Sequence, residues 1–143
     1  MTEQNFKNHF KFVPLYHFVA LPLLLVNLGW AVWQLVGAQG VPQFLAVAVA
    51  AALFLGALFG RVFALKVQDR VIRLEMRLRL VGVLPQEQRG ASDRLSTAQL
   101  IGLRFASDAE LPGLIKTVLD GNIQNKNAIK KMVKHWVPDY ERA

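Results

Sequence analysis

The chain contains one long stretch without charge, and this stretch limits what the chain can fold into. Between Lys11 and Arg61 there is no Asp, Glu, Lys or Arg, and most of the residues are apolar. A helix that crosses the hydrocarbon core of a bilayer needs about 20 apolar residues. The stretch is therefore long enough for two spanning helices. A secretory signal peptide explains it less well, because the apolar region of such a peptide has only about 7 to 15 residues.

The first spanning helix is predicted at residues 13–36, after a cytoplasmic N-terminal arm at residues 1–12. Trp30 and Trp33 lie near its far end, and aromatic side chains gather at membrane surfaces in this way. Pro22 lies in its interior and removes one backbone hydrogen bond. We therefore expect a kink within this helix.

A short extracytoplasmic loop at residues 37–41 forces the next helix to run antiparallel to the first. That helix is predicted at residues 42–81, where it begins as the second spanning helix and continues as a cytoplasmic stalk. Pro42 suits the first turn of a helix, and no other proline occurs before Pro85. No local signal would end the helix where the charged residues begin at Arg61.

Basic residues near the ends of the two spans predict the orientation of this hairpin. The short loop has none, whereas Lys7 and Lys11 precede the first span. Because cytoplasmic flanks carry the excess of Lys and Arg, both termini are expected in the cytoplasm. The formal net charge of +7 is interpreted first as this topology signal. The basic residues after the second span are Arg61, Lys66, Arg70, Arg73, Arg77 and Arg79.

Arg61 and Lys66 lie nearest to the predicted membrane surface. A basic residue close to the cytoplasmic leaflet gains about 1 kcal/mol from anionic headgroups. These two residues are therefore the candidates for contact with anionic lipid. The alternative is that they belong to a face that is simply exposed to water.

Small residues recur at every fourth position of the predicted second span. This pattern lets another backbone approach closely. It either seats the first span of the same chain or forms a contact with another chain. The residues of this small-residue ridge are Ala48, Ala52, Gly56, Gly60 and Ala64.

Asn27 is a polar residue near the middle of the first span. An unpaired amide is costly there, and a hydrogen bond to a neighbouring helix contributes about 0.6 to 2 kcal/mol. A contact within the hairpin is the ordinary interpretation. A pore or a polar contact between chains is the alternative.

The predicted stalk carries apolar residues at alternate spacings of four and three, as in a coiled-coil seam. Either a partner or the chain's own C-terminal helices must cover such a seam. Asp69 with Arg73, and Glu75 with Arg79, have the spacing of ion pairs on one helix. The seam consists of Val67, Val71, Leu74, Leu78 and Val81.

Residues 82–95 are predicted to form a turn-rich connector, and residues 96–143 a small helical cytoplasmic region. Ser96 and Gln99 have the spacing of a capping box, so a helix is expected from Ser96 to about Phe105. This is the first of three short helices in the region.

The second short helix has two possible starts. Ser107 repeats the capping signal, but a start near Leu111 places Pro112 in the first turn, where proline is favoured. The helix is expected to end at Asp120, with Gly121 as its cap.

The third short helix is expected to begin at Asn125 and to stop before Pro138. Ile129, Val133 and Trp136 would share one of its faces. Three short helices contain too few residues for a core of their own. They are therefore expected to pack on the stalk, on copies of themselves or on a partner.

Lysines surround this third helix and raise the question of nucleic-acid binding. Few aromatic residues accompany them, and the sequence contains no recognised DNA- or RNA-binding motif. This distribution disfavours nucleic acid as a partner. The lysines are Lys126, Lys130, Lys131 and Lys134.

The sequence offers few residues suited to catalysis or to metal binding. Cysteine is absent, and histidine occurs only at His9, His17 and His135. Zinc-protease, nucleophile-elbow, phosphate-loop and dinucleotide-binding motifs are absent from the sequence. His17 has the chemistry to ligate a haem or chlorin metal or to relay protons, but a histidine that faces headgroups is the simpler interpretation. We therefore predict no enzymatic activity, no cofactor and no metal site.

Four segments of the chain carry a resemblance to known sequences: EQNFKNHFKFVPLYHFVALPLLL, FALKVQDRVIRLEMRLRL, LSTAQLIGLRFASDAELPGL and AIKKMVKHW. Together they resemble a family of uncharacterised small bacterial membrane proteins with two spans, and the resemblance covers nearly the whole chain. It implies a bacterial membrane protein but supplies no activity and no site residues. With the predicted topology, we expect a multi-pass protein of the bacterial inner membrane.

The predicted fold is an all-α membrane protein, in which a two-helix transmembrane hairpin extends into a cytoplasmic stalk and ends in about three short helices. We expect a non-enzymatic interaction or scaffold protein that either associates with itself or is an accessory subunit of a larger membrane complex. The small-residue ridge would form its contact in the membrane, and the stalk seam its contact in the cytoplasm. The alternatives are a small homo-oligomeric channel and a membrane-tethered nucleic-acid binder.

Overall fold

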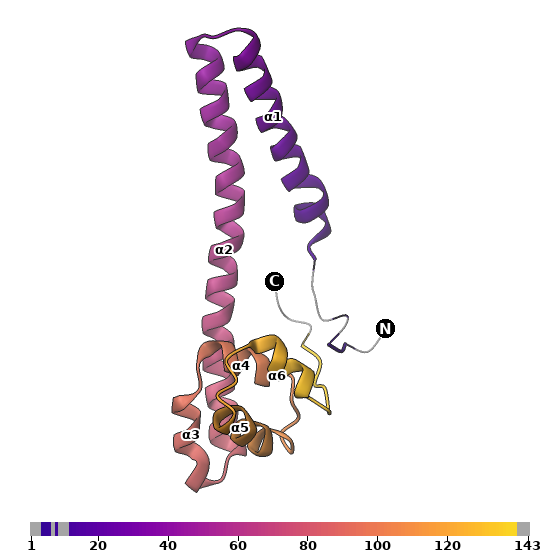
Figure 1. Cartoon of the computed structure of the whole chain (residues 1–143), viewed down its shortest axis with the longest axis vertical. Coiled ribbons are helices and arrows are strands. Elements are labelled where there is room, and N and C mark those ends of the chain that lie inside the picture. The colour runs from indigo at the N-terminus through magenta and orange to yellow at the C-terminus, as the bar shows by residue number, and fades with distance from the viewer. Residues whose placement is uncertain (1–3, 7, 9–11, 140–143) are drawn as a thin grey trace. The chain divides into compact units, whose positions relative to one another are not determined.

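The computed structural model describes residues 4–6, 8 and 12–139 of the chain (Figure 1). Within these residues, every regular element of secondary structure is a helix. Two of the helices are long and apolar. The predicted all-helical fold with two long apolar helices is therefore confirmed.

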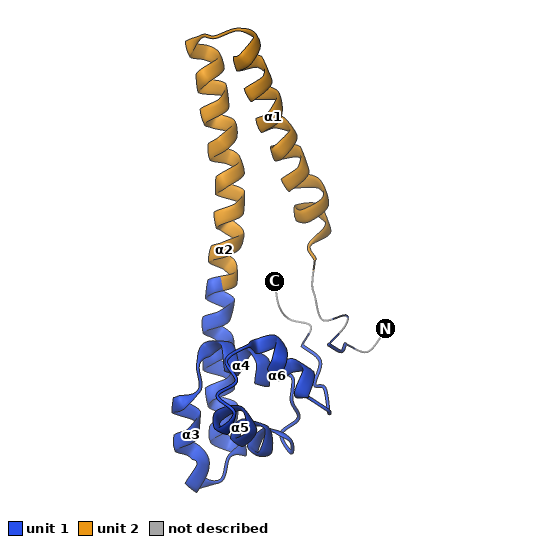
Figure 2. Ribbon diagram, viewed as in Figure 1, with its two compact units in different colours: residues 1–10, 66–142 blue, residues 11–65, 143 orange. Residues whose placement is uncertain are grey.

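The chain divides into two compact units (Figure 2). One unit lies within residues 11–65, and the other combines residues 1–10 with residues 66–142. The boundary falls inside helix α2 (Val41–Val83), which contributes residues to both units.

The unit within residues 11–65 begins with a wide helical turn. Residues Leu15–Ala20 form a π-helix, labelled η1, and α1 follows at Leu21–Gly37. The N–H of Leu21 donates to the carbonyl of Tyr16, five residues earlier. Pro22 has no N–H to donate to the preceding turn, and its ring crowds that turn. A wider turn just before Pro22 accommodates both the missing hydrogen bond and the ring. The expected distortion at Pro22 thus takes the form of a π-helical segment.

Residues 38–40 connect α1 to α2. The α1 helix ends where Ala38 takes an extended conformation, and its N–H still donates to the carbonyl of Gln34. The α2 helix begins at Val41, with Pro42 in its first turn. A single helix is present where the sequence predicted one at residues 42–81.

The two long helices turn apolar side chains outward. The segments Leu15–Gly37 and Val41–Val83 are each long and apolar enough to cross a membrane, by length and composition. Only 6% of the most apolar window of each is buried within the structure. The core helix of a soluble protein buries its apolar residues instead.

The unit that contains residues 66–142 has a core built on one face of α2. Ile72, Met76 and Leu80 of this helix are buried, together with residues of α4 (Thr97–Leu103), α5 (Leu111–Asp120) and α6 (Lys126–Met132). The short C-terminal helices thus pack on the stalk segment of their own chain. The largest fully buried side chains are those of Leu80, Leu100, Leu103, Phe105, Leu111, Val118 and Ile129.

The predicted turn-rich connector at residues 82–95 is largely helical. It contains a 3-10 helix, η2, at Gln86–Gln88 and a short helix α3 at Arg89–Arg94. Ala91 of α3 packs against the same core as the buried Leu95. This contact with residues distant in sequence explains why turn-forming residue types adopt helical structure here.

The α4 helix starts at its predicted capping box, and α5 starts at the predicted first-turn proline. Ser96 accepts a hydrogen bond from the N–H of Gln99, and the Gln99 side chain accepts one from the N–H of Ser96, which confirms the capping box. The α5 helix begins at Leu111 with Pro112 in its first turn, so the later of the two possible starts is correct.

The α5 helix ends at Asp120 with Gly121 as its cap, as predicted. Gly121 occupies the cap position but keeps a right-handed conformation, and Asn122 takes the left-handed one, with φ of 46°. Ile123 N donates to the carbonyl of Val118 at 3.0 Å, and Asn122 N donates to that of Leu119 at 3.1 Å. These two bonds form a Schellman motif, in which asparagine tolerates the left-handed position.

The α6 helix begins as predicted and ends earlier than predicted. The side chain of Asn125 caps its start by accepting bonds from two backbone N–H groups. The helix ends at Met132, and Trp136 pairs with Ala106 in an isolated β-bridge. The indole of Trp136 stacks on the ring of Phe105, with centroids 4.3 Å apart. Prediction of a helical face that included Trp136 was therefore wrong, because a tertiary stacking contact outweighs the helical periodicity.

Gly102 of α4 packs closely against α6, and its replacement tests this packing. A Cβ atom at Gly102 would lie 2.9 Å from Ile129 Cβ and 3.1 Å from the Lys126 carbonyl oxygen. Gly102→Ala should lower the local free energy of unfolding by about 1 to 2 kcal/mol, because overpacking outweighs the gain in helix propensity. Amide hydrogen exchange of α4 and α6 in the full-length protein should then be faster by roughly five- to thirtyfold.

Gly113→Ala is the matched control, because nothing lies within 4 Å of a Cβ at this exposed position of α5. This substitution should slow exchange in its own helix, since alanine favours a helix over glycine by about 0.8 to 1 kcal/mol. Equal effects of the two substitutions would contradict the close α4–α6 packing.

Candidate functional site

The segment of α2 that begins at Lys66 has apolar residues on two opposite sides. Ile72, Met76 and Leu80 form the side that the chain's own helices bury. The predicted seam occupies the other side at about 3.6 residues per turn, and it is exposed. Of the two possible covers for the seam, the chain's own C-terminal helices are therefore excluded. We call this exposed set the stalk face; it consists of Val67, Val71, Leu74, Leu78 and Val81.

A large part of the apolar surface of the stalk face is exposed. Leu74 is 61% exposed and Leu78 67% exposed, although both are large side chains. Contiguous apolar surface of this kind usually marks a binding site for protein or membrane. This face is the candidate functional site of the chain.

Arginines border one side of the stalk face. A groove runs along α2 between these arginines and the stalk face. It is lined by Val67, Arg70, Val71, Arg73, Leu74 and Arg77. Glu75 is exposed on the opposite border. Within the described part of the chain, neither Asp69 with Arg73 nor Glu75 with Arg79 forms an ion pair, so those two predicted pairs are not observed. The exposed face is therefore basic along one border and acidic at one point of the other.

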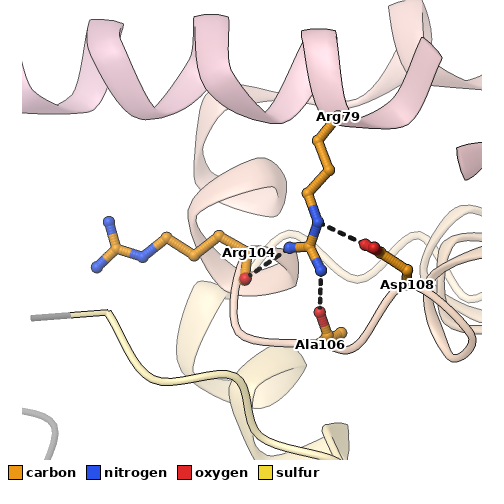
Figure 3. Close-up of polar contacts among 4 residues, drawn as sticks. All are labelled: Arg79, Arg104, Ala106 and Asp108. Carbon is orange, nitrogen blue, oxygen red and sulfur yellow. Dashed lines mark hydrogen bonds and ion pairs between the residues drawn. The ribbon is translucent and has the colours of Figure 1, made fainter. Parts of the chain in front are cut away.

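The half-buried side chain of Arg79 extends from α2 to the segment between α4 and α5 (Figure 3). Its Nε donates to Asp108 Oδ1 at 2.7 Å, its Nη1 to the Arg104 carbonyl at 3.0 Å and its Nη2 to the Ala106 carbonyl at 2.7 Å. One guanidinium thus satisfies three acceptors in the segment between α4 and α5, which suits its planar set of donors. The clamp fixes the side of α2 that turns inward and so leaves the stalk face outward.

Sequence reasoning missed the role of Arg79 and its partners. A signal was present, because Arg79 follows Ile72 by seven residues and Met76 by three, and so lies on the buried face. A charged residue on an apolar helix face requires partners within the fold. Asp108 could not be identified as that partner, because the path of the chain between α4 and α5 is set by tertiary structure.

Cations gather around Phe105 in the same unit. The Arg104 guanidinium lies 4.5 Å and the Lys130 ammonium 5.2 Å from the centre of its ring. Arg104 also pairs with Asp139 at 3.3 Å. Lys130 is only 5% exposed, so not all four lysines around the predicted third helix face solvent. Two basic residues of this region therefore stabilise the fold through cation–π contacts.

The N-terminal arm joins this unit through its described residues. Gln4 exchanges two hydrogen bonds with the backbone of Asp139, at 3.0 and 2.7 Å. The ammonium of Lys131 lies 5.5 Å from the centre of the Phe6 ring. Residues from both ends of the sequence thus lie in one compact unit. Lys7, His9 and Lys11 lie outside the described residues.

The small-residue ridge in the other unit is exposed along its length. Contact between the two long helices involves other residues, namely the buried Ala31 and Ala50, and a 2.7 Å hydrogen bond from the Tyr16 hydroxyl to the Ala57 carbonyl. A Cβ added at Gly56 or Gly60 would meet nothing within 4 Å. The ridge does not seat α1, so it is free to contact another chain. All of Ala48, Ala52, Gly56, Gly60 and Ala64 are exposed.

The remaining candidate residues are Asn27, Arg61, Lys66 and His17. Asn27 is exposed on α1 and lies outside the contact with α2. Lys66 is exposed and Arg61 is half-buried. His17 Nδ1 lies 2.9 Å from the Val13 carbonyl, at the start of η1.

Potential metal ligands do not cluster in the described part of the chain. No group of three or more His, Asp or Glu side chains there is placed to hold a metal ion. The exposed apolar face of α2 therefore remains the arrangement with the clearest capacity to bind something.

Comparison with known proteins gives one result. No curated protein and no solved structure matches the chain. A family described as "Family of unknown function (DUF6526)" matches residues 1–143. Since the match covers the full length, the chain belongs to this family of unknown function.

Proposed function

We propose that the chain is a non-enzymatic integral membrane protein that presents the stalk face as a docking surface. It either associates with itself or is an accessory subunit of a larger membrane complex. The observation that carries this proposal is that the chain covers one side of α2 with its own helices and leaves the opposite apolar side exposed. Burial of a leucine or valine side chain contributes about 1.5 to 3 kcal/mol, so a partner on this face would gain substantial stability.

Membrane anchoring by the hairpin is the second part of the proposal. Both long helices expose apolar side chains, as a lipid environment requires. Residues from both ends of the chain lie in one unit, which supports an even number of crossings between them. The basic flank after the second span favours a cytoplasmic location of that unit in the bacterial inner membrane, with Arg61 and Lys66 near anionic headgroups.

A channel is less well supported than a docking role. A water-filled pore requires polar groups along the face of a spanning helix. The exposed surface of α1 offers mainly apolar and aromatic side chains, with Asn27 and Gln34 as its amides. The exposed residues of α1 therefore suit contact with lipid better than contact with water.

Charge on the stalk face should disrupt docking. The double substitution Leu74→Glu with Leu78→Glu should weaken association by at least about tenfold, because both apolar side chains lose their burial and two charges must be desolvated. The measurement is native mass, in mild detergent, of full-length protein purified together with its partners. Wild type should show a species heavier than the monomer, and the double variant should show mainly monomer.

Lys116→Glu is the control for this experiment. It changes the net charge by the same amount at an exposed position of α5, away from the stalk face. Association should be unaffected by this substitution. An unchanged heavy species in the Leu74 and Leu78 variant would contradict docking through the stalk face.

The small-residue ridge should provide a separate contact within the membrane. Gly56→Leu with Gly60→Leu should prevent close approach of another helix and reduce the native mass, while the protein still inserts into the membrane. Gly29→Leu adds the same side chain at an exposed position of α1 where nothing lies within 4 Å of a Cβ, and it should have no effect on mass. If all three substitutions leave the mass unchanged, the ridge has no role in assembly.

A further inference from the structure

We infer that the partner of the stalk face is a second copy of this chain, paired in parallel and in register through residues 67–81. This inference rests on the proposed docking function and names its partner. Such a pair requires two features. The apolar side chains of the two copies must interdigitate, and oppositely charged residues beside them must face each other across the dimer. Both features lie on the described surface of α2.

The apolar residues of the stalk face fit one coiled-coil register. Val67, Leu74 and Val81 occupy d positions of the heptad, and Val71 and Leu78 occupy a positions. All of these residues are exposed. A second helix with the same spacing would place its side chains into the gaps between them, as knobs into holes.

The chain's own helices leave room for this second helix. In the same register, Ile72, Met76 and Leu80 occupy b, f and c positions, which point away from the seam. These are the residues that the C-terminal helices bury. Arg79, which clamps the segment between α4 and α5, also occupies a b position. The C-terminal helices therefore lie on the side opposite to the pairing surface.

Charge on the two borders selects the parallel arrangement. Arg70 and Arg77 occupy g positions, and Glu75 occupies an e position. In a parallel pair, a g residue faces the e residue of the following heptad on the other helix, so Arg70 of each copy meets Glu75 of the other. In an antiparallel pair, a positions pack against d positions, g faces g and e faces e, so arginine at g would meet arginine, and Glu75 would meet either itself or Gln68. Only the parallel pair brings opposite charges together.

Membrane insertion imposes the same choice of direction. Two copies inserted with one topology have α2 running in the same direction, so their stalk faces can meet only in parallel. The seam spans about two heptads, which is too short for a stable coiled coil in water. Anchoring in one bilayer raises the effective concentration of the two stalks and compensates for this short length. Pairing should therefore require the full-length protein in a membrane or a mild detergent.

Disulfide crosslinking in native membranes tests the arrangement directly. The chain contains no cysteine, so single cysteines can be introduced without background. Val67→Cys, Leu74→Cys and Val81→Cys should each crosslink to the same residue of a second copy, because facing d positions meet the Cα separation of about 4.4 to 6.8 Å that a disulfide requires. Arg73→Cys, at an exposed c position, is the control and should not crosslink to itself.

The pattern of crosslinks distinguishes parallel from antiparallel pairs. In an antiparallel pair, d positions pack against a positions, so none of the three cysteines would crosslink to itself, and Leu74→Cys would crosslink instead to Val71→Cys or Leu78→Cys in mixed membranes. That pattern would overturn the inference. Charge reversal adds an independent test: Glu75→Arg should lower the yield from Leu74→Cys by about fivefold, and addition of Arg70→Glu should restore it.

Failure of self-pairing is distinguishable from failure of docking. If none of the three cysteines crosslinks, alone or mixed with Val71→Cys or Leu78→Cys, but all are protected from a water-soluble maleimide in native membranes, another protein covers the face; self-pairing is then wrong and the docking function stands. If all three react as fast as Arg73→Cys and none crosslinks, the face is open to water. Both the inference and the docking function are then wrong.

Discussion

Burial of one side of α2 by the chain's own C-terminal helices is the interaction on which the rest of the unit that contains residues 66–142 depends. The helices α4, α5 and α6 are too short to form a core without Ile72, Met76 and Leu80 of α2. The helix in turn cannot rotate to bury its other apolar side, because Arg79 binds acceptors between α4 and α5. Exposure of the stalk face is thus a consequence of how this unit folds.

Features of the fold that depend on neighbouring residues could be predicted from the sequence. The capping box at Ser96 and the cap at Asn125 depend on contacts within one turn of helix, and both are observed. The end of α6 depends instead on the stacking of Trp136 on Phe105, which are distant in sequence. Helical periodicity carries no information about such a contact, so it extended the predicted helix past Met132.

The candidate site could be predicted in part for the same reason. Alternate spacings of four and three define the seam from Val67 to Val81 by sequence alone. Whether the chain's own helices cover the seam depends on which of two apolar sides of α2 they choose. Ile72, Met76 and Leu80 form a second set at helical spacing, and the sequence patterns of the two sets are of similar quality. The hydrogen bonds of Arg79 determine which of the two sides is buried. Two of its acceptors are backbone carbonyls, which no pattern of side chains in the sequence reveals.

The positive charge of the chain has several physical roles rather than one. If the positive charge is interpreted only as a topology signal, all basic residues after the predicted second span have the same role. In the structure they differ: Arg79 and Arg104 pair with carboxylates and Lys130 covers an aromatic ring, whereas Arg70 and Arg73 stay at the border of the stalk face. Arginine suits the internal roles because its planar group serves several acceptors at once. The net charge of +7 already subtracts the carboxylates of Asp108 and Asp139, so these two ion pairs leave it unchanged and instead fix where two of the positive charges lie.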